Sequence, residues 1–267
     1  MTHTARSIFA LIACSLSLAA CEGVTGGSSG NPIGVGGVGA RTKGAGYTMG
    51  PQISFYRVTG ATFITSMGAR DTCFLTSYSA PTTPTTSTAP KLSAGAIITM
   101  ATGTRTDTLT RPTGGTDQTY RSPLTSGIPF TPGDSMVISI AGDVNGFPIS
   151  TFRGKTAEPF VLNPPTLPSG AGPITITWTP AQDLNAAMFV NFRYLAGTAT
   201  TLNRQIACTF ADDGSGTVPA TVTADWLAAT TRDYTAERIR TILATVPVPL
   251  SYFNIVSSFN WPTPVSP

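Results

Sequence analysis

Residues able to carry acid–base or nucleophilic chemistry are sparse in this chain of 267 residues. Its single histidine, His3, lies in an N-terminal segment with the features of a cleaved export signal. Removal of that segment leaves no imidazole for a Ser-His or Cys-His couple or for a zinc site. The 13 Asp and Glu residues also leave little material for a pair of catalytic carboxyl groups. We therefore predict no enzyme, no catalytic residue and no cofactor, with a carboxylate-dependent glycosidase as the open alternative.

The densest acidic stretch is Asp212-Asp213-Gly214-Ser215-Gly216. Carboxylate oxygens suit Ca²⁺, so Asp212 and Asp213 are the candidate metal ligands of the chain. The alternating Asp-x-Asp-x-Asp-Gly spacing of a calcium loop and its distal Glu are missing, however. Asp-Gly is also a common centre of hairpin turns, because glycine tolerates the positive φ angles that such turns need. We therefore expect a turn here and no bound metal.

Aromatic side chains are the other candidate binding groups, because an exposed ring can serve as a platform for a sugar. Trp178 alternates in phase with Ile174 and Ile176, which predicts a position in the core. Trp261 lies next to Pro262 near the end of the chain, which predicts exposure. Trp261 is therefore the candidate ligand-binding residue.

The chain has four cysteines. Cys14 lies inside the N-terminal segment and Cys21 at its end, which leaves Cys73 and Cys208 in the body of the protein. An even pair in an exported protein predicts one disulfide, although two buried free cysteines are the alternative. No CxxC motif or Cys/His cluster indicates a zinc site.

The first 21 residues follow the plan of a secretory signal. Arg6 precedes an apolar run that is too short to span a bilayer. The run closes on Leu18-Ala19-Ala20-Cys21, which resembles the lipobox of bacterial lipoproteins. In that family the signal is removed just before the Cys, whose sulfur carries a diacylglyceryl group. The resemblance therefore implies a cleaved signal over residues 1–20 and lipidation of Cys21.

Two other interpretations of this segment compete with lipidation at Cys21. Leu11-Ile12-Ala13-Cys14 also fits the lipobox pattern, but cleavage there leaves an apolar core of only about seven residues, near the lower limit for a signal. The segment also fits an ordinary secretory signal in which Cys21 is incidental. Glu22 follows the Cys, and in some bacteria Asp at that position retains lipoproteins in the inner membrane. Since Glu22 is not Asp, the resemblance favours the outer membrane over the inner one.

The overall charge gives no reason to expect a nucleic-acid partner. Charged residues make up 11% of the chain, and the formal net charge is +3. The basic residues are scattered along the sequence, so they form no patch with the field that a polyanion requires. Glycine, proline and small polar residues are abundant, which is typical of short strands joined by tight turns.

The elements that would position these residues are mostly strands. Residues 21–46 are rich in glycine and predict a disordered linker. From residue 47 onward, apolar and polar residues alternate in short runs between turn residues, which predicts an all-β fold. Prolines in 163–170 mark a break, so we expect one β-sandwich region over 47–165 and a second over 166–267.

The second region contains Ile174-Thr175-Ile176-Thr177-Trp178-Thr179-Pro180, which resembles a strand of immunoglobulin-like and fibronectin-like sandwiches. The resemblance implies an immunoglobulin-like β-sandwich, built as one large sandwich or two packed ones. Cys73 and Cys208 are too far apart in sequence for the bridge within an antibody domain. Their disulfide would either tie two sandwiches together or belong to one interleaved unit.

Two segments near the C-terminus need individual predictions. Residues 219–229 predict a single short helix that begins at Pro219 and turns Trp226 and Leu227 inward. Residues 234–246 fit a helix or a strand. We favour a strand, because residues 252–259 offer it a partner across 247–249.

Together these features predict a cell-envelope lipoprotein that acts as a structural, adhesive or accessory binding module. Its expected partners are the membrane, through a lipid anchor, and an envelope protein or a glycan. The alternative is a carbohydrate-binding lipoprotein that uses exposed aromatic side chains, with or without calcium.

Overall fold

The computed structural model of the chain describes residues 31–43, 45–58, 70–80, 90–112, 118–182, 185–245 and 252–260. Within these ranges the protein is all-β apart from one short helix. The elements in chain order are β1 (Asn31–Lys43), β2 (Gly46–Val58), β3 (Thr72–Ser77), β4 (Ile97–Thr102), β5 (Arg105–Thr110), β6 (Tyr120–Arg121), β7 (Ile128–Phe130), β8 (Ser135–Ile140), β9 (Ser150–Lys155), β10 (Ile174–Thr177), β11 (Ala187–Tyr194), β12 (Arg204–Ala211), β13 (Ser215–Val218), α1 (Ala220–Ala228), β14 (Arg232–Thr245) and β15 (Tyr252–Asn260).

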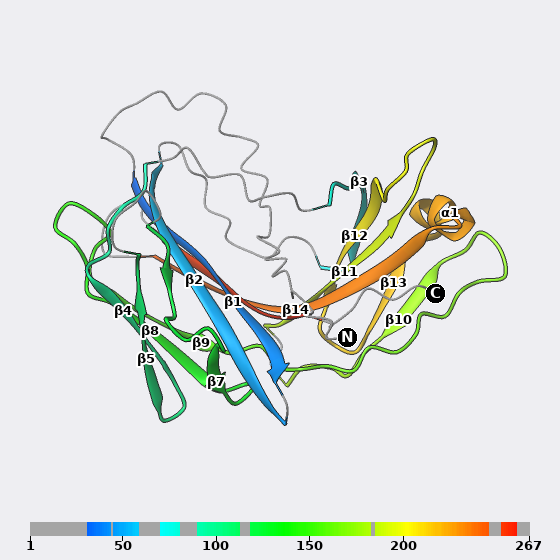
Figure 1. Cartoon of the computed structure of the whole chain (residues 1–267). Coiled ribbons are helices and arrows are strands. Elements are labelled where there is room, and N and C mark those ends of the chain that lie inside the picture. Colours follow the sequence, from blue (N-terminus) through cyan, green and yellow to red (C-terminus); the bar gives the residue numbers. More distant parts are fainter. Residues whose placement is uncertain are drawn as a thin grey trace, which may run out of the picture.

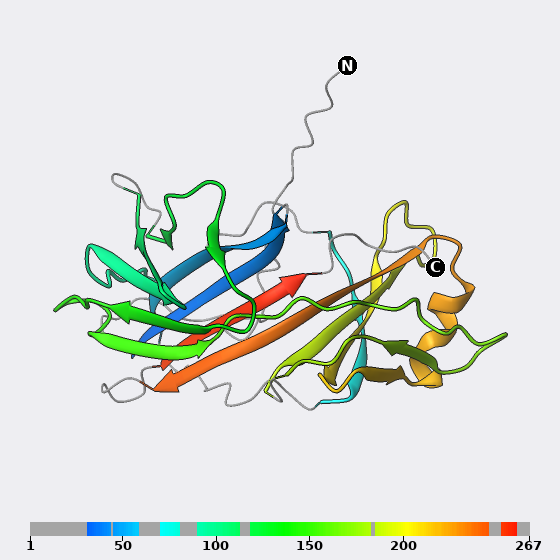
Figure 2. The same ribbon diagram turned by 90° about the horizontal axis from the view of Figure 1, so that it is seen from below.

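Thirteen strands form one mixed sheet. Its order is β3-β12-β11-β14-β15-β1-β2-β6-β5-β4-β8-β9, and β7 pairs with β2 beside this path. β1 runs parallel to β15 and antiparallel to β2. β10 and β13 form a separate antiparallel pair. Figures 1 and 2 show that the sheet is divided into two lobes that lie side by side.

Lobe 1 is the part of the sheet that runs from the second half of β14 to β9. This part of the sheet coils back on itself and brings β9 against β15. Phe152 in β9 stacks on Phe253 in β15 with the ring centroids 3.9 Å apart. Gly154 in β9 also lies against β14, where an added Cβ would lie 2.2 Å from Ile242 Cδ1. Glycine is needed at this contact for the two strands to approach. The enclosed core includes Phe55, Tyr120, Phe147, Ile138 and Ile255.

Lobe 2 is a second layered unit around its own core. The strands β3, β12, β11 and the first half of β14 form one layer, and the β10–β13 pair packs beside them with α1 (Figure 2). Trp226 of α1 is fully buried and meets Phe192 edge to face, with the centroids 5.1 Å apart. Trp178 is buried in the same cluster as Ile174 and Ile176, as their alternation predicts.

One strand, β14, belongs to both lobes. Its residues Arg232–Ile239 pair with β11 in lobe 2, and its residues Glu237–Thr245 pair with β15 in lobe 1. The backbone hydrogen bonds of the two lobes therefore overlap at Glu237–Ile239. A continuous strand with partners in both halves couples the lobes mechanically.

The predicted disordered linker over 21–46 is wrong for residues 31–43, which form β1 in the middle of the large sheet. The glycines there serve close packing. A Cβ at Gly34 would lie 2.5 Å from Phe253 Cδ2 and 2.9 Å from Phe55 Cε1. β1 has little apolar surface of its own, so the rings of β15 and β2 supply its burial.

The predicted division at residues 165 and 166 does not separate the two cores. β3 comes early in the chain but joins lobe 2, and β14 and β15 return from lobe 2 to lobe 1. The chain is thus an interleaved unit, the second of the two alternatives raised by the cysteine spacing. The predicted short helix is present as α1, and the strand preferred for 234–246 is present as β14 paired with β15.

The helix α1 has nine residues. In the described ranges, no helix reaches the length and apolar character that are needed to cross a bilayer.

Candidate functional site

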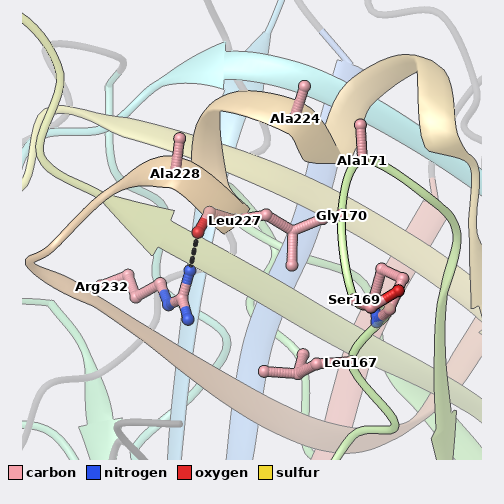
Figure 3. A pocket seen from close by; sticks show the side chains of 9 residues that line it. Leu167, Ser169, Gly170, Ala171, Ala224, Leu227, Ala228 and Arg232 are labelled. Carbon is pink, nitrogen blue, oxygen red and sulfur yellow. Dashed lines mark hydrogen bonds between the residues drawn. The ribbon is translucent and has the colours of Figure 1, made fainter.

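A shallow cavity of about 380 Å³ lies in lobe 2 between α1 and the loop that precedes β10 (Figure 3). Most of its lining is apolar or small, so it could accept a small apolar group. The lining residues are Leu167, Pro168, Ser169, Gly170, Ala171, Ala224, Leu227, Ala228 and Arg232.

Arg232 is the charged side chain of this lining, and it is engaged by the helix. Its Nη1 donates to the carbonyl oxygens of Trp226, at 3.0 Å, and of Leu227. Its guanidinium also lies over the Trp226 ring, 4.7 Å from the centroid. The guanidinium thus donates hydrogen bonds to carbonyl oxygens in the last turn of the helix, where carbonyls generally lack an intrahelical partner. The cavity lining therefore holds no carboxylate, histidine or cysteine, and its one side-chain hydroxyl is that of Ser169.

The strongest polar cluster lies instead at the junction of the lobes, around Asp212 and Arg238. The two side chains are 0% and 1% exposed. Arg238 Nε donates to Asp212 Oδ2 at 2.6 Å, and Nη2 donates to Oδ1 at 2.9 Å. Trp178 Nε1 donates to the same Oδ1 at 2.7 Å. The carboxylate thus accepts three hydrogen bonds from two buried side chains.

Arg238 also binds the backbone of both neighbouring loops. Its Nη1 donates to Pro159 O at 2.8 Å, and its Nη2 donates to Thr179 O. The guanidinium lies over the Phe160 ring, 5.3 Å from the centroid. Burying a charge is costly unless it is paired and hydrogen-bonded, and these contacts meet that requirement.

A second arginine of β14 repeats this arrangement two residues further on. Arg240 Nη2 donates to Glu158 Oε1 at 2.7 Å, and Nη1 donates to Thr156 O at 2.8 Å. Glu158 Oε2 also accepts from the backbone N–H of Gln182 at 3.2 Å. Arg238 and Arg240 therefore fasten the segment 156–160, which leads from lobe 1 to lobe 2, onto β14. The cluster is a structural clamp.

Asp212 and Asp213, the acidic pair that the sequence singled out, lie in different surroundings. Asp212 is buried in the clamp, whereas Asp213 is exposed in the turn between β12 and β13 and accepts from Ser215 N at 3.3 Å. Gly214 has a φ of +107°, as the predicted turn requires. The two carboxylates serve different partners, and in the described residues no group of three or more His, Cys, Asp or Glu could hold a metal.

Among the described acids, burial brings the pKa of Glu237 close to neutrality. Burial raises the pKa of Glu237 to about 7, while a hydrogen bond with Ser258 opposes that rise. It lies next to Arg238 in β14, so the alternation of a strand points it to the opposite face. It is absent from the lining of the cavity in Figure 3. Glu237 thus has the pKa of a proton carrier, but it lies outside the cavity beside α1.

The predicted disulfide is present. Cys73 and Cys208 are bonded, with an S–S distance of 2.09 Å, and they lie opposite each other in the neighbouring strands β3 and β12. The bond stays within lobe 2 and pins the edge strand of the sheet. It does not join two separate sandwiches.

Two of the predicted site residues, Cys21 and Trp261, lie outside the described residues. Trp178 and Trp226 are buried, so their faces are closed to a sugar. Sequence reasoning missed Arg238 and Arg240. A signal existed, because both share the face of β14 on which Tyr234, Ala236 and Ile242 are buried. Charged residues in phase with buried ones indicate buried acidic partners.

Comparison with known proteins adds no assignment, since no family model, no curated protein and no solved structure matches this chain.

Proposed function

We propose that the protein is a cell-envelope lipoprotein, anchored through lipid on Cys21, that works by surface contact and not by catalysis. The observation that carries the proposal is the Cys73–Cys208 disulfide. Disulfides persist in oxidising compartments outside the cytosol. The bond therefore agrees with export by the signal in residues 1–20, which ends on Leu18-Ala19-Ala20-Cys21.

The architecture suits a contact module. The two lobes share β14. A force that acts on one lobe, or on a partner bound to it, is therefore transmitted to the other lobe through a continuous strand. The cavity beside α1 and the buried clamp offer no couple of reactive groups. We accordingly assign the protein a structural, adhesive or accessory binding role, on the outer membrane in preference to the inner one because residue 22 is Glu.

The edge strand β3 is the surface that best supports a binding role. Phe74 and Leu75 are large apolar side chains, and both are exposed there. The disulfide holds β3 against β12, which keeps this edge in place. Edge strands offer backbone groups to an added strand from a partner. An extended segment of an envelope protein is the kind of partner that fits this edge.

We also propose that lobe 2 is the immunoglobulin-like part of the protein. Support comes from the packing of two layers, with Ile174 and Ile176 of β10 in the same core as Val190 and Ile206 of the large sheet. Face-to-face packing of strands around one core is the architecture of a β-sandwich. An experimental structure with a different strand order in lobe 2 would contradict this assignment.

The test of the anchor is a pair of matched cysteine variants. Cys21→Ala should release the protein from the membrane fraction, because no sulfur remains at the cleavage point to carry the lipid. Cys14→Ala is the control, since it removes the competing lipobox cysteine and should leave the protein in the membrane. Intact-mass measurement should find lipid on a chain that begins at residue 21. Release by Cys14→Ala alone, or a native protein without acyl mass, would refute the proposal.

A further inference from the structure

Three exposed aliphatic side chains lie at one end of lobe 1. Val144 is 98% exposed, Ile149 74% and Ile97 41%. Ile97 and Ile149 each lie one residue outside the terminal pairs Ile98–Ile140 and Ile140–Ser150. Since the side chains of Ile98 and Ile140 point into the core, the alternation of a strand turns Ile97 and Ile149 outward at the same rim. We call Ile97, Val144 and Ile149 the apolar rim.

The turn that carries Val144 is fixed by several contacts. Asp143 Oδ1 accepts from Asn145 N at 3.0 Å, and Asp143 O accepts from Gly146 N at 3.0 Å. Asp143 N also donates to Phe147 O at 2.9 Å. Phe147 is fully buried in the core of lobe 1, so it holds the base of the turn. The protein therefore presents an apolar side chain to solvent from an ordered turn.

The rim lies at the end of lobe 1 where β1 begins. Pro32, the second residue of β1, pairs with Arg57 of β2. Arg57 Nη2 in turn donates to Asn145 O, in the Val144 turn, at 3.3 Å. The chain thus joins the sheet of lobe 1 beside the apolar rim.

The length of chain before β1 limits how far this end can be from the lipid. Nine residues, 22–30, separate Cys21 from Asn31. Their covalent geometry limits this distance to about 35 Å. β1 has 13 residues and spans about 43 Å at the usual rise of a strand. A lipid on Cys21 therefore cannot reach the far end of β1.

Positive side chains accompany the apolar rim. Arg57 contacts the Val144 turn, and the backbone of Lys91 forms an isolated antiparallel β-bridge with Tyr56, the neighbour of Arg57. Arg111 directly follows Thr110, the partner of Ile97 in β5. Asp143 is the acid of the Val144 turn. Apolar side chains flanked by cations are the composition expected of a surface that binds anionic lipid.

We propose that this end of lobe 1 contacts the bilayer, with the apolar rim among the lipid headgroups and Arg57, Lys91 and Arg111 beside their phosphates. The inference rests on the proposed lipid anchor at Cys21. It adds an orientation, in which lobe 1 lies on the membrane and lobe 2 extends away from it with the β3 edge.

The test uses the mature lipidated protein in vesicles of phosphatidylethanolamine and phosphatidylglycerol. An environment-sensitive fluorophore is attached at Val144→Cys, or at Thr104→Cys as the matched control. Thr104 is exposed in the turn between β4 and β5, at the opposite end of β4 from Ile97. We expect a blue shift and quenching by lipid-borne quenchers at Val144→Cys, and a spectrum typical of water at Thr104→Cys.

A second measurement removes the side chains of the rim. In the unlipidated mature chain, residues 21–267 with Cys21→Ala, the combined change of Ile97, Val144 and Ile149 to Ser should lower binding to the same vesicles by about tenfold or more, because it removes three aliphatic groups from the contact.

The outcomes separate this inference from the anchor. Protein that floats with vesicles while the Val144→Cys probe stays in water keeps the anchor and overturns the contact. Equal spectra at Val144→Cys and Thr104→Cys overturn it as well. A native protein that carries no acyl chain and does not float overturns the anchor and this inference together.

Discussion

Removal of the Asp212 carboxylate should be the most damaging single change to the clamp between the lobes. Asp212→Ala leaves the Arg238 guanidinium buried without its counter-ion, which typically costs 3 to 5 kcal/mol. The hydrogen bonds from Arg238 to Pro159 O and Thr179 O remain in this variant, and they keep the cost near the lower value of about 3 kcal/mol. Trp178 Nε1 also loses its acceptor, which adds about 1 kcal/mol. We expect a total loss of about 4 kcal/mol.

The measurement is equilibrium unfolding in urea at pH 7 with the disulfide intact, followed by tryptophan fluorescence, because Trp178 and Trp226 are both buried. We expect one transition, since β14 belongs to both lobes. Asp213→Ala is the matched control. Its carboxylate is exposed in the turn beside Asp212, so its loss should change the free energy of unfolding by less than about 0.5 kcal/mol.

A double variant separates the buried charge from a loss of packing. Asp212→Ala with Arg238→Met removes both charges, so it should be more stable than Asp212→Ala alone, because no ion is buried without a partner. Equal losses for Asp212→Ala and Asp213→Ala would refute the reasoning. A double variant less stable than Asp212→Ala would show that the arginine is retained for its packing.

Three further predictions test other parts of the structure. Because burial raises the pKa of Glu237 to about 7, the folded state holds its proton more tightly than the unfolded state, so the free energy of unfolding should fall from about pH 4.5 to pH 7. Glu237→Gln should abolish that part of the pH dependence and be more stable than the natural protein at pH 8. Gly34→Ala should destabilise by about 1 to 3 kcal/mol through overpacking, whereas Gly37→Ala, with open space around it, should cost less, and unfolding in urea compares them. Replacement of Cys73 and Cys208 by Ser should lower the free energy of unfolding by up to about 4 to 5 kcal/mol relative to the disulfide-bonded protein, on the chain-entropy model, and the reduced natural protein should lose a similar amount as the control.

Local features of the fold could be predicted because their causes are local. The alternation of Ile174, Ile176 and Trp178 placed the indole in the core, and it lies there. The Asp-Gly turn after β12 follows from the φ that Gly214 adopts. The helix α1 follows from Pro219 and the pattern after it. Each depends on a few consecutive residues and on the geometry of one element.

The candidate site was less accessible to sequence reasoning. Asp212 and Asp213 are adjacent in sequence and look equivalent, yet one is buried beneath Arg238 and the other faces solvent. Arg238 lies 26 residues from Asp212. The distinction depends on how β14 packs against the turn, and neighbouring residues do not encode it. The exposure of the apolar rim likewise depends on the ends of three strands.

The all-β class could be predicted from the alternation along the chain alone. The sequence also favoured a Cys73–Cys208 disulfide over free cysteines and a strand over a helix for residues 234–246, and the structure confirms both. Residues 31–43 form a central strand only because distant segments pack around them. A run of glycine and valine has too little side chain to order itself, and it becomes a strand only where Phe55 and Phe253 fill the space that its glycines leave. Tertiary structure also decided that β3 joins lobe 2 and that one strand serves both lobes. These outcomes follow from contacts between segments that are distant in sequence. Local sequence patterns do not predict the free energy of such contacts.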